Sequence, residues 1–345
     1  MDPISQGAVA AAFAQASQTK QSREKLIAAT WIGAAAGMSP DLDVFIRSST
    51  DPLLFLEFHR HFTHALIFIP IGAAIVATTL HWFVRKHLSY KEAYLACLLA
   101  YCTHGLLDAC TTYGTQLLQP FSDYRVAWNN ISVVDPLFTV PLVIGVILAC
   151  RLHSQRMVQI CILWIVSYLS LGWIQMERAT TVGAQIAATR GHQPSELSMK
   201  PSFGNLLVWK SIYAHEGRYY VDGIRTGWDV TVCPGTSVEK LDRTKHLPFM
   251  QAESQQAIDL ERFRWFSQGY LAATGVPGEV TDMRYSMVPN QVDPMWGITL
   301  TEGASSDQHI EWWTRREADE QRRDEFFQLL TGASCYPIEE IEQLL

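Results

Sequence analysis

The segment HALIFIPIGAAIVATTLHWFV, from His64 to Val84, contains no Asp, Glu, Lys or Arg, and two cations, Arg85 and Lys86, follow it directly. A membrane-spanning helix needs about 20 mainly apolar residues, and cations at one end are typical of its cytoplasmic side. This segment predicts a transmembrane helix. It decides the fold class, because a chain with such a helix is expected to be a membrane protein.

Other apolar segments lie on both sides of this helix. Residues 90–112, 137–150 and 157–174 predict three more spans, which makes about four in all. Residues 4–18 and 26–40 are too short to cross a bilayer and predict a helical hairpin, part-buried in the membrane or, as the alternative, packed in a soluble core. The expected N-terminal region is therefore an α-helical polytopic membrane domain.

The charge of the 345-residue chain differs between its two halves. Residues 1–174 carry ten acidic and eleven basic side chains, a net charge of +1, whereas residues 175–345 carry 24 and 16, a net charge of −8. Such an acidic surface argues against a nucleic-acid partner, because phosphate binding requires basic residues. We predict a membrane-embedded domain over residues 1–174 and a small soluble α+β domain over residues 175–345.

Four segments of the second half indicate its secondary structure. Residues 200–226 predict a hairpin that turns at His215-Glu216-Gly217, and residues 279–288 and 295–301 predict strands. Residues 309–332 predict an amphipathic helix that stops at Gly332. Cys233 and Cys335 could pair if this half faces an oxidising compartment, which the sequence does not decide.

The stretch DLDVFIRSSTDPLLFLEFHRHFTH, residues 41–64, is unusually rich in metal-binding side chains for a segment that precedes a spanning helix. It holds Asp41, Asp43, Asp51, Glu57, His59, His61 and His64. Carboxylates and imidazoles bind zinc and manganese, and ionisable groups near a bilayer usually mark function. The stretch predicts a metal or catalytic cluster; the alternative is a polar loop whose histidines only form hydrogen bonds.

Further ligands are expected from the segment at residues 90–112. His104 and Asp108 are four residues apart, so a helix places them on one face. They suit two ligands of one metal, although a hydrogen-bonded pair within a helical core would have the same spacing. Asp41 and Asp43 share a face if their segment is extended, but one of them could instead cap the next turn.

The loop cations indicate which segments meet. Lys20, Arg23 and Lys25, then Arg85, Lys86 and Lys91, then Arg151 and Arg156 occupy alternate connections, which predicts a shared cytoplasmic side. The opposite face would then receive residues 41–64, His104, Asp108 and the loop at residues 120–136. Asp135 in that loop is expected to be a ligand, a base or a helix cap. Arg60 is expected to bind an anionic substrate group or to pair with a carboxylate.

With these pieces in place, the chain resembles the YdjM-like family of predicted membrane-bound metal-dependent hydrolases. The resemblance is carried by MDPISQGAVAAAFAQA, AAAGMSPDLDV, HRHFTHALIF, THGLLDACTTYGTQLLQPFSDYRVAW and VVDPLF, and in the second half by FGNLLVWKSIYAHEGRYYVDGIR and VTDMRYSM. It implies a polytopic inner-membrane protein with metal ligands at Asp41, Asp43, His59, His64, His104 and Asp108, and it also carries over Asp135. His61 stands where the family usually has glycine, so it fits the ligand pattern poorly.

The expected function is a membrane-bound hydrolase that uses metal-activated water on a lipid or lipid-linked ester or phosphoester at the non-cytoplasmic face. The ligands exceed what one tetrahedral zinc needs, so one or two divalent ions are expected, with zinc favoured and manganese as the alternative. Asp135 or a spare carboxylate of the cluster would serve as base, and Arg60 would hold substrate charge. The soluble half would be periplasmic. Two alternatives remain: an ion or proton-coupled transporter with an intramembrane His/Asp path, and a metal-stabilised membrane scaffold.

Overall fold

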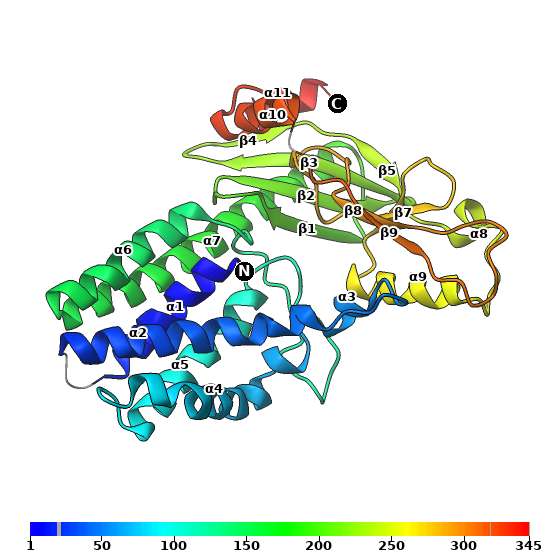
Figure 1. Cartoon of the computed structure of the whole chain (residues 1–345). Helices are drawn as coiled ribbons and strands as arrows, with labels where there is room; N and C mark the ends of the chain where they lie inside the picture. The colour runs from blue at the N-terminus through cyan, green and yellow to red at the C-terminus, as the bar shows by residue number, and fades with distance from the viewer. Residues whose placement is uncertain (19–21, 318, 345) are drawn as a thin grey trace. The chain divides into compact units, whose positions relative to one another are not determined.

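Figure 1 shows the computed structural model of the chain, which describes residues 1–18, 22–317 and 319–344. Lys20, one of the predicted cytoplasmic cations, lies outside these residues. Backbone contacts divide the chain into two compact units, each described by itself below. The first comprises Met1–Ile46, Phe58–Trp173 and Phe203–Asn205, and the second comprises Arg47–Glu57, Ile174–Ser202 and Leu206–Leu345. The second unit therefore includes a short segment, residues 47–57, that lies far outside the predicted soluble region.

The first unit begins with the predicted helical hairpin. Helices α1 (Pro3–Ala16) and α2 (Arg23–Met38) pack along one another (Figure 1). Glycine makes this close approach possible: a Cβ atom at Gly33 would lie 2.3 Å from the Cβ of Ala14, and one at Gly37 would lie 2.1 Å from the Cβ of Ala10. The hairpin brings the end of α2, from which the first predicted ligands follow, against the helix that carries His104.

Short 3₁₀ segments separate α2 from the next long helix. In chain order they are η1 (Ser39–Phe45), the short helix α3 (Leu54–Phe58), η2 (Phe62–His64) and η3 (Leu66–Phe68). The regular helix α4 runs from Ile69 to Val84, later than the predicted start at His64. Pro70 explains the shift, because proline is favoured in the first turn of a helix and lacks the N–H needed further inside. His64 is thus held in its own short turn.

Three further helices complete the first unit: α5 (Tyr90–Ala109), α6 (Pro136–Leu152) and α7 (Gln155–Thr189), whose residues from Ile174 on belong to the second unit. As expected, the last apolar segment continues without a break into the polar residues after Gln175. Among the described residues, Leu66–Val84 and Gln155–Thr189 are long and apolar enough to cross a membrane, while α6 is a shorter apolar helix. The four-span arrangement is not confirmed and stays a prediction, because two described helices, rather than four, have this length and composition.

The second unit is built on two antiparallel sheets. The larger has the order β1-β2-β3-β4-β10, with β5 also beside β3, and the smaller has the order β6-β7-β8-β9. The strands are β1 (Glu196–Pro201), β2 (Val208–His215), β3 (Arg218–Thr226), β4 (Val230–Cys233), β5 (Ser237–Glu239), β6 (Leu271–Ala273), β7 (Glu279–Asp282), β8 (Trp296–Thr299), β9 (Glu311–Thr314) and β10 (Tyr336–Pro337). The helices are α8 (Arg243–His246), α9 (Gln255–Phe266), α10 (Glu320–Thr331) and α11 (Ile338–Leu344). The predicted hairpin is confirmed: Glu216 and Gly217 have positive φ angles of 45° and 74° and join β2 to β3.

The predicted helix over residues 309–332 is wrong in its first half. Residues 311–314 form β9, which pairs with β8, and the helix α10 starts only after its N-cap Asp319. The cause is tertiary packing, since the ring of Trp312 lies against the rings of Phe55 and Phe263 at centroid distances of 5.4 and 5.9 Å. The predicted stop is correct: Gly332 ends α10 with a φ of 85°.

Cys233, at the end of β4, and Cys335, just before β10, form a disulfide across 102 residues of sequence. The sequence left this pairing open. The bond joins two strands that are also neighbours in the sheet.

Two lysines are buried side by side in the larger sheet. Lys200 on β1 and Lys210 on β2 are direct register partners, with exposed fractions of 4% and 3%. The Lys210 ammonium donates to Ser286 Oγ (2.8 Å) and to the carbonyl oxygen of Gln291 (2.9 Å). Burial lowers the pKa of each lysine to about 7. Both groups therefore bind protons less tightly in the folded chain than in an unfolded one.

We expect the stability of this unit to rise with pH between about 7 and 10. Below pH 7 both lysines are charged in both states; above it the unfolded state, with its ordinary lysine pKa near 10.5, binds more protons than the folded state. Each lysine can contribute up to about 1.4 kcal/mol per pH unit. Thermal unfolding of the full chain in detergent, followed by tryptophan fluorescence, should show the rise. Lys200→Met should make the rise of stability with pH less steep, and the surface variant Lys245→Met should leave it unchanged. A wild-type stability that does not change with pH would contradict the expectation.

Candidate metal centre

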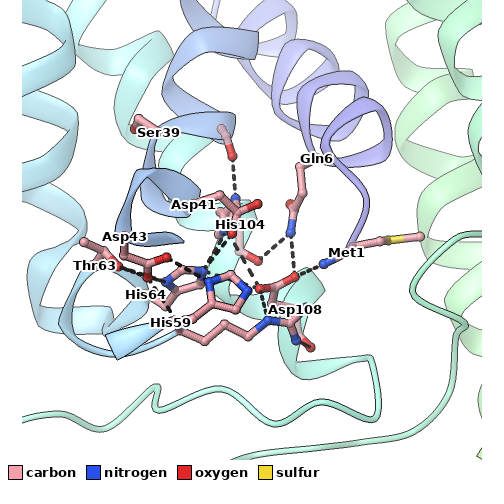
Figure 2. Close-up of polar contacts among 12 residues, drawn as sticks. Met1, Gln6, Ser39, Asp41, Asp43, His59, Thr63, His64, His104 and Asp108 are labelled. Carbon is pink, nitrogen blue, oxygen red and sulfur yellow. Dashed lines mark hydrogen bonds and ion pairs between the residues drawn. The ribbon is translucent and has the colours of Figure 1, made fainter. Parts of the chain in front are cut away.

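Four ligand atoms from three separate segments face one another in the first unit (Figure 2). The Nε2 atoms of His64 and His104 are 2.9 Å apart, and Asp41 Oδ1 lies 3.4 and 3.3 Å from them. Asp108 Oδ2 lies 3.4 Å from His64 Nε2 and 3.9 Å from His104 Nε2. Two imidazole nitrogens and two carboxylate oxygens around one point match the ligand types and number of a tetrahedral zinc site.

Each ligand is delivered by a local feature of the sequence. Asp41 lies on η1, which continues directly from α2, and His64 is the last residue of η2. His104 and Asp108 lie one turn apart on the buried face of α5, as their spacing predicted. The structure thus brings together four of the six predicted metal ligands.

The outer nitrogens of both imidazoles are held by oxygen atoms. His104 Nδ1 contacts the backbone oxygen of Gly37, and His64 Nδ1 lies 3.0 Å from Thr63 Oγ1 and 3.2 Å from Asp43 Oδ2. A carbonyl oxygen can only accept, so His104 carries its proton on Nδ1 and presents the lone pair of Nε2 to the centre. Metal-binding histidines are oriented in this way. The neutral form of His64 presents Nε2 in the same way, and a cation between the two facing nitrogens would stabilise the arrangement.

Asp43 supports the centre from outside. Its Oδ1 lies 2.8 Å from His59 Nδ1, and its Oδ2 accepts hydrogen bonds from the backbone N–H of Arg60 (3.0 Å) and the hydroxyl of Thr63 (2.8 Å). Asp43 and His59, together with Asp41, also form a second group of ligand atoms that lie within 4.8 Å of one another. Asp43 and His59 therefore either orient the first group or hold a second ion that shares Asp41.

The surroundings of Asp41 and Asp43 lower the pKa values of both carboxyl groups. Burial opposes the charge of Asp41, but hydrogen bonds to His104 and His64 hold its pKa well below the usual range. Burial likewise opposes the charge of Asp43, and hydrogen bonds to His59 and His64 hold its pKa below the usual range. Together with Asp108 they place three carboxylates around two imidazoles, and the guanidinium of Arg60 and the amino group of Met1 offset part of this negative charge.

Arg60 and the start of the chain meet Asp108 from the other side. Arg60 is buried with a φ of 66°; its Nε lies 2.9 Å from Asp108 Oδ2, and its Nη1 donates to Thr111 Oγ1 (2.9 Å). Asp108 Oδ1 contacts the amino group of Met1 and accepts from Gln6 Nε2 (2.8 Å). Among the described residues, Asp108 Oδ2 is buried and accepts no hydrogen bond of good geometry. Apart from its ion pair with Arg60, this oxygen has no partner of good geometry among the described residues, so it could also bind a metal.

Arg60 thus adopts the second of its two predicted roles, pairing with a carboxylate, and a role toward substrate stays a prediction. The guanidinium group also lies 4.7 Å from the centroid of the Tyr113 ring. Tyr113 and Gln6 were missed by the sequence analysis. The available signal for Gln6 was a polar side chain in an otherwise alanine-rich helix, where it is fully buried.

Of the three roles expected for Asp135, the structure shows the helix cap. Asp135 is the N-cap of α6: its Oδ1 accepts from the N–H groups of Leu137 (3.1 Å) and Phe138 (3.3 Å), and its Oδ2 accepts from the Tyr168 hydroxyl (2.8 Å). It belongs to neither ligand group found among the described residues. Both of its oxygens accept hydrogen bonds from helical segments, and a role as catalytic base stays a prediction.

Three other ionisable residues of the stretch at 41–64 also lie outside the two ligand groups. The ring of His61 packs against those of Phe58 and Phe62, with centroids 5.8 and 6.0 Å away. Asp51 and Glu57 belong to the second unit, where both pair with Arg262. The density of ligand-type residues in this stretch therefore overstated its share of the site.

Gly105 controls how closely α5 approaches His64. A Cβ atom at Gly105 would lie 2.5 Å from the backbone oxygen of His64, so Gly105→Ala must displace the turn that holds this ligand. We expect a loss of metal affinity of about tenfold or more, as when the support of a ligand is removed, measured by zinc titration against a chromogenic chelator. In Gly145→Ala the new Cβ would meet only the sulfur of Cys161 (2.6 Å), so this control should keep its affinity. Equal affinities in the two variants would contradict the expectation.

The two described helices that are long and apolar enough to cross a membrane and the His/Asp centre of the first unit define a membrane protein with a candidate site for a divalent metal. The chain belongs to the YdjM inner membrane protein family, whose model matches residues 1–179. That range contains every residue of both ligand groups. Membership of this family places the protein in the inner membrane.

Similarity to individual proteins is limited. The uncharacterized protein YfhP of Bacillus subtilis (strain 168) is 29% identical over 102 residues, which cover 30% of this chain and 31% of that protein. The chain thus spans about a third of the length of the curated relative that it matches. No solved structure matches the chain.

Proposed function

We propose that this protein is a membrane-bound, metal-dependent hydrolase that acts on an ester or phosphoester of a lipid or lipid-linked molecule at the non-cytoplasmic face. One observation carries the proposal: the two imidazole Nε2 atoms and the oxygens of Asp41 and Asp108 face a single point. The outer nitrogens of both imidazoles meanwhile contact oxygen atoms. Such a preorganised set is what a hydrolytic metal site requires.

Each side chain has a role in this proposal. Asp41, His64, His104 and Asp108 would hold the ion, for which zinc suits the mixed nitrogen and oxygen ligands and manganese is the alternative. A divalent ion there would supply Lewis-acid activation of water. His59, bonded to Asp43 through Nδ1, leaves its Nε2 as a proton acceptor or as a ligand for a second ion. Its partial exposure, 20%, allows contact with a substrate.

The membrane arrangement is also part of the proposal. Four spans with the cations of the loops on the cytoplasmic side would put the metal centre and the second unit on the other side. The disulfide between Cys233 and Cys335 supports a position of the second unit on the non-cytoplasmic side, because disulfides persist in oxidising compartments. In intact cells, a membrane-impermeant reductant followed by a thiol reagent should expose and label these two cysteines.

The test of activity uses the full chain purified in detergent. Elemental analysis should find one or two zinc or manganese ions per chain. Hydrolysis would be assayed with p-nitrophenyl acetate, p-nitrophenyl phosphate, bis(p-nitrophenyl) phosphate and phospholipid in mixed micelles. Asp41→Ala should abolish any turnover, and a chelator should abolish it until metal is added back, while His61→Ala should leave it intact. Protein without stoichiometric metal would overturn the proposal.

A further inference from the structure

The segment η1 has two chemically different faces. Asp43 points inward and is 3% exposed, whereas the apolar side chains of Leu42 and Phe45 are 61% and 79% exposed. Residues three apart share a face of a 3₁₀ helix, so Leu42 and Phe45 form one apolar face beside the metal ligands. Exposing two large apolar side chains next to a charged centre is costly in water and requires a reason.

A second apolar surface follows His64. Phe62 and Leu66 are exposed, and Ile67, Ile71 and Ile75 follow at four-residue spacing, each about half exposed. Residues four apart lie on one helix face, so these isoleucines form a stripe along the segment Leu66–Val84, which is long and apolar enough to cross a membrane. The segment η1 contacts both η2 and α4, so the exposed residues of η1 lie on an element that neighbours the one carrying this stripe.

We propose that these residues form a lipid-facing surface at the mouth of the metal centre, covered by the acyl chains of phospholipids. We call it the apolar rim, and it consists of Leu42, Phe45, Phe62, Leu66 and Ile67. Two arguments select lipid as the occupant. The chain is an inner membrane protein by family, and the rim is continuous with the exposed stripe of a helix that can span the membrane.

The rim determines how a substrate reaches the centre. His64, His104 and Asp108 have no exposed side-chain surface, whereas the side chain of Asp41 is 25% exposed and that of His59 is 20% exposed. The open side of the centre is therefore beside Asp41, whose chain neighbour is Leu42. An amphiphile could place its polar bond at Asp41 and His59 while its acyl chain lies along the rim. This substrate class rests on the proposed hydrolase function; the position of the rim in lipid does not.

Photo-crosslinking tests the position directly. p-Benzoylphenylalanine would replace Leu42 or Phe45 in the full chain, reconstituted in vesicles of phosphatidylethanolamine and phosphatidylglycerol. After irradiation, mass spectrometry should find phospholipid adducts at both positions. The matched control is Phe327 on α10, an exposed phenylalanine (57%) of the second unit, which should give none. Adducts to another part of the protein or to a second copy, or lipid adducts no more frequent than at Phe327, would overturn the proposal.

Two measurements, metal content and turnover, test the lipid-facing rim and the hydrolase function independently of each other. Metal content by elemental analysis should equal that of the wild type in every variant, which shows that the centre is folded. The double variant Leu42→Ser/Phe45→Ser should lower turnover of vesicle phospholipid at least about tenfold, given the apolar area lost, and leave turnover of p-nitrophenyl acetate within about twofold of wild type. Lipid adducts without any hydrolysis would keep the rim and overturn the hydrolase. Metal-loaded protein that hydrolyses substrate but gives no lipid adducts would overturn the rim and keep the hydrolase.

Discussion

Replacing His104 by alanine is expected to remove the bound metal. His104 supplies one of the four inward-facing atoms, and the pair of imidazole nitrogens 2.9 Å apart cannot exist without it. Three ligands would remain, of which Asp108 is also paired with Arg60. We expect metal content to fall from about one ion per chain or more to near zero after dialysis, measured by elemental analysis, and metal-dependent turnover to fall with it.

The control is His61→Ala, which removes an imidazole only three residues from His64. His61 lies in neither ligand group of the described residues, so this variant should keep its metal. Far-ultraviolet circular dichroism should show that both variants retain their helices. Stoichiometric metal in His104→Ala would show that the ion binds elsewhere, for example in the group of Asp41, Asp43 and His59.

Metal removal also separates the alternative functions. If the centre is only structural, a chelator should lower the melting temperature of the wild type and leave no activity to lose. If the histidines belong to an ion path, vesicle flux should disappear in His104→Ala without any hydrolysis at all. The hydrolase alone predicts turnover that returns when metal is added back.

Most residues of the metal centre were predicted from the spacing, the composition and the charge pattern of the sequence. The spacing of His104 and Asp108 on a helix follows from helical periodicity, and the apolar segment after His64 follows from composition. The convergence of Asp41 and His64 with these residues was inferred from the alternation of loop cations. These signals were available because membrane insertion depends on composition and on charge near the helix ends.

Other features could not be inferred, because each depends on packing between distant residues. Asp135 precedes a proline at a helix start, and its sequence position allowed a ligand, a base or a cap; its hydrogen bonds with Tyr168 and the N–H groups of α6 show the cap. Likewise, β9 was expected to be helical, since its pairing with β8 has no local signal. Helix propensity is a weak predictor wherever tertiary packing decides.

The assignment of residues 47–57 to the second unit is another long-range effect, and Arg262 makes the ion pairs that contribute to it. Arg262 on α9 donates to Asp51 through Nη1 (3.0 Å) and Nη2 (2.8 Å), contacts Glu57 through Nε (2.5 Å), and also bonds Asp259 (2.9 Å). Asp51 precedes Arg262 by 211 residues. This segment joins Asp43 to His59 along the chain.

Arg262→Met is therefore expected to release residues 47–57. The substitution keeps the apolar stem but leaves three carboxylates without their shared cation, and the side chain of Asp259 is fully buried. Removing one partner of a buried ion pair costs about 3–5 kcal/mol; with Asp51 and Glu57 partly exposed we expect about 2–3 kcal/mol. Hydrogen exchange of the full chain should show protection of amides 47–57 falling at least about tenfold.

The matched control lies on the same helix. Arg264 is half-exposed and pairs only loosely with the equally exposed Glu261, at 3.6 Å, so Arg264→Met should leave exchange at residues 47–57 unchanged. Unchanged protection in Arg262→Met would mean that this segment is held by the packing of Phe55 on Trp312 instead. Weaker metal binding in Arg262→Met alone would show that the second unit sets the spacing between Asp43 and His59, since Arg262 touches neither residue group of the centre.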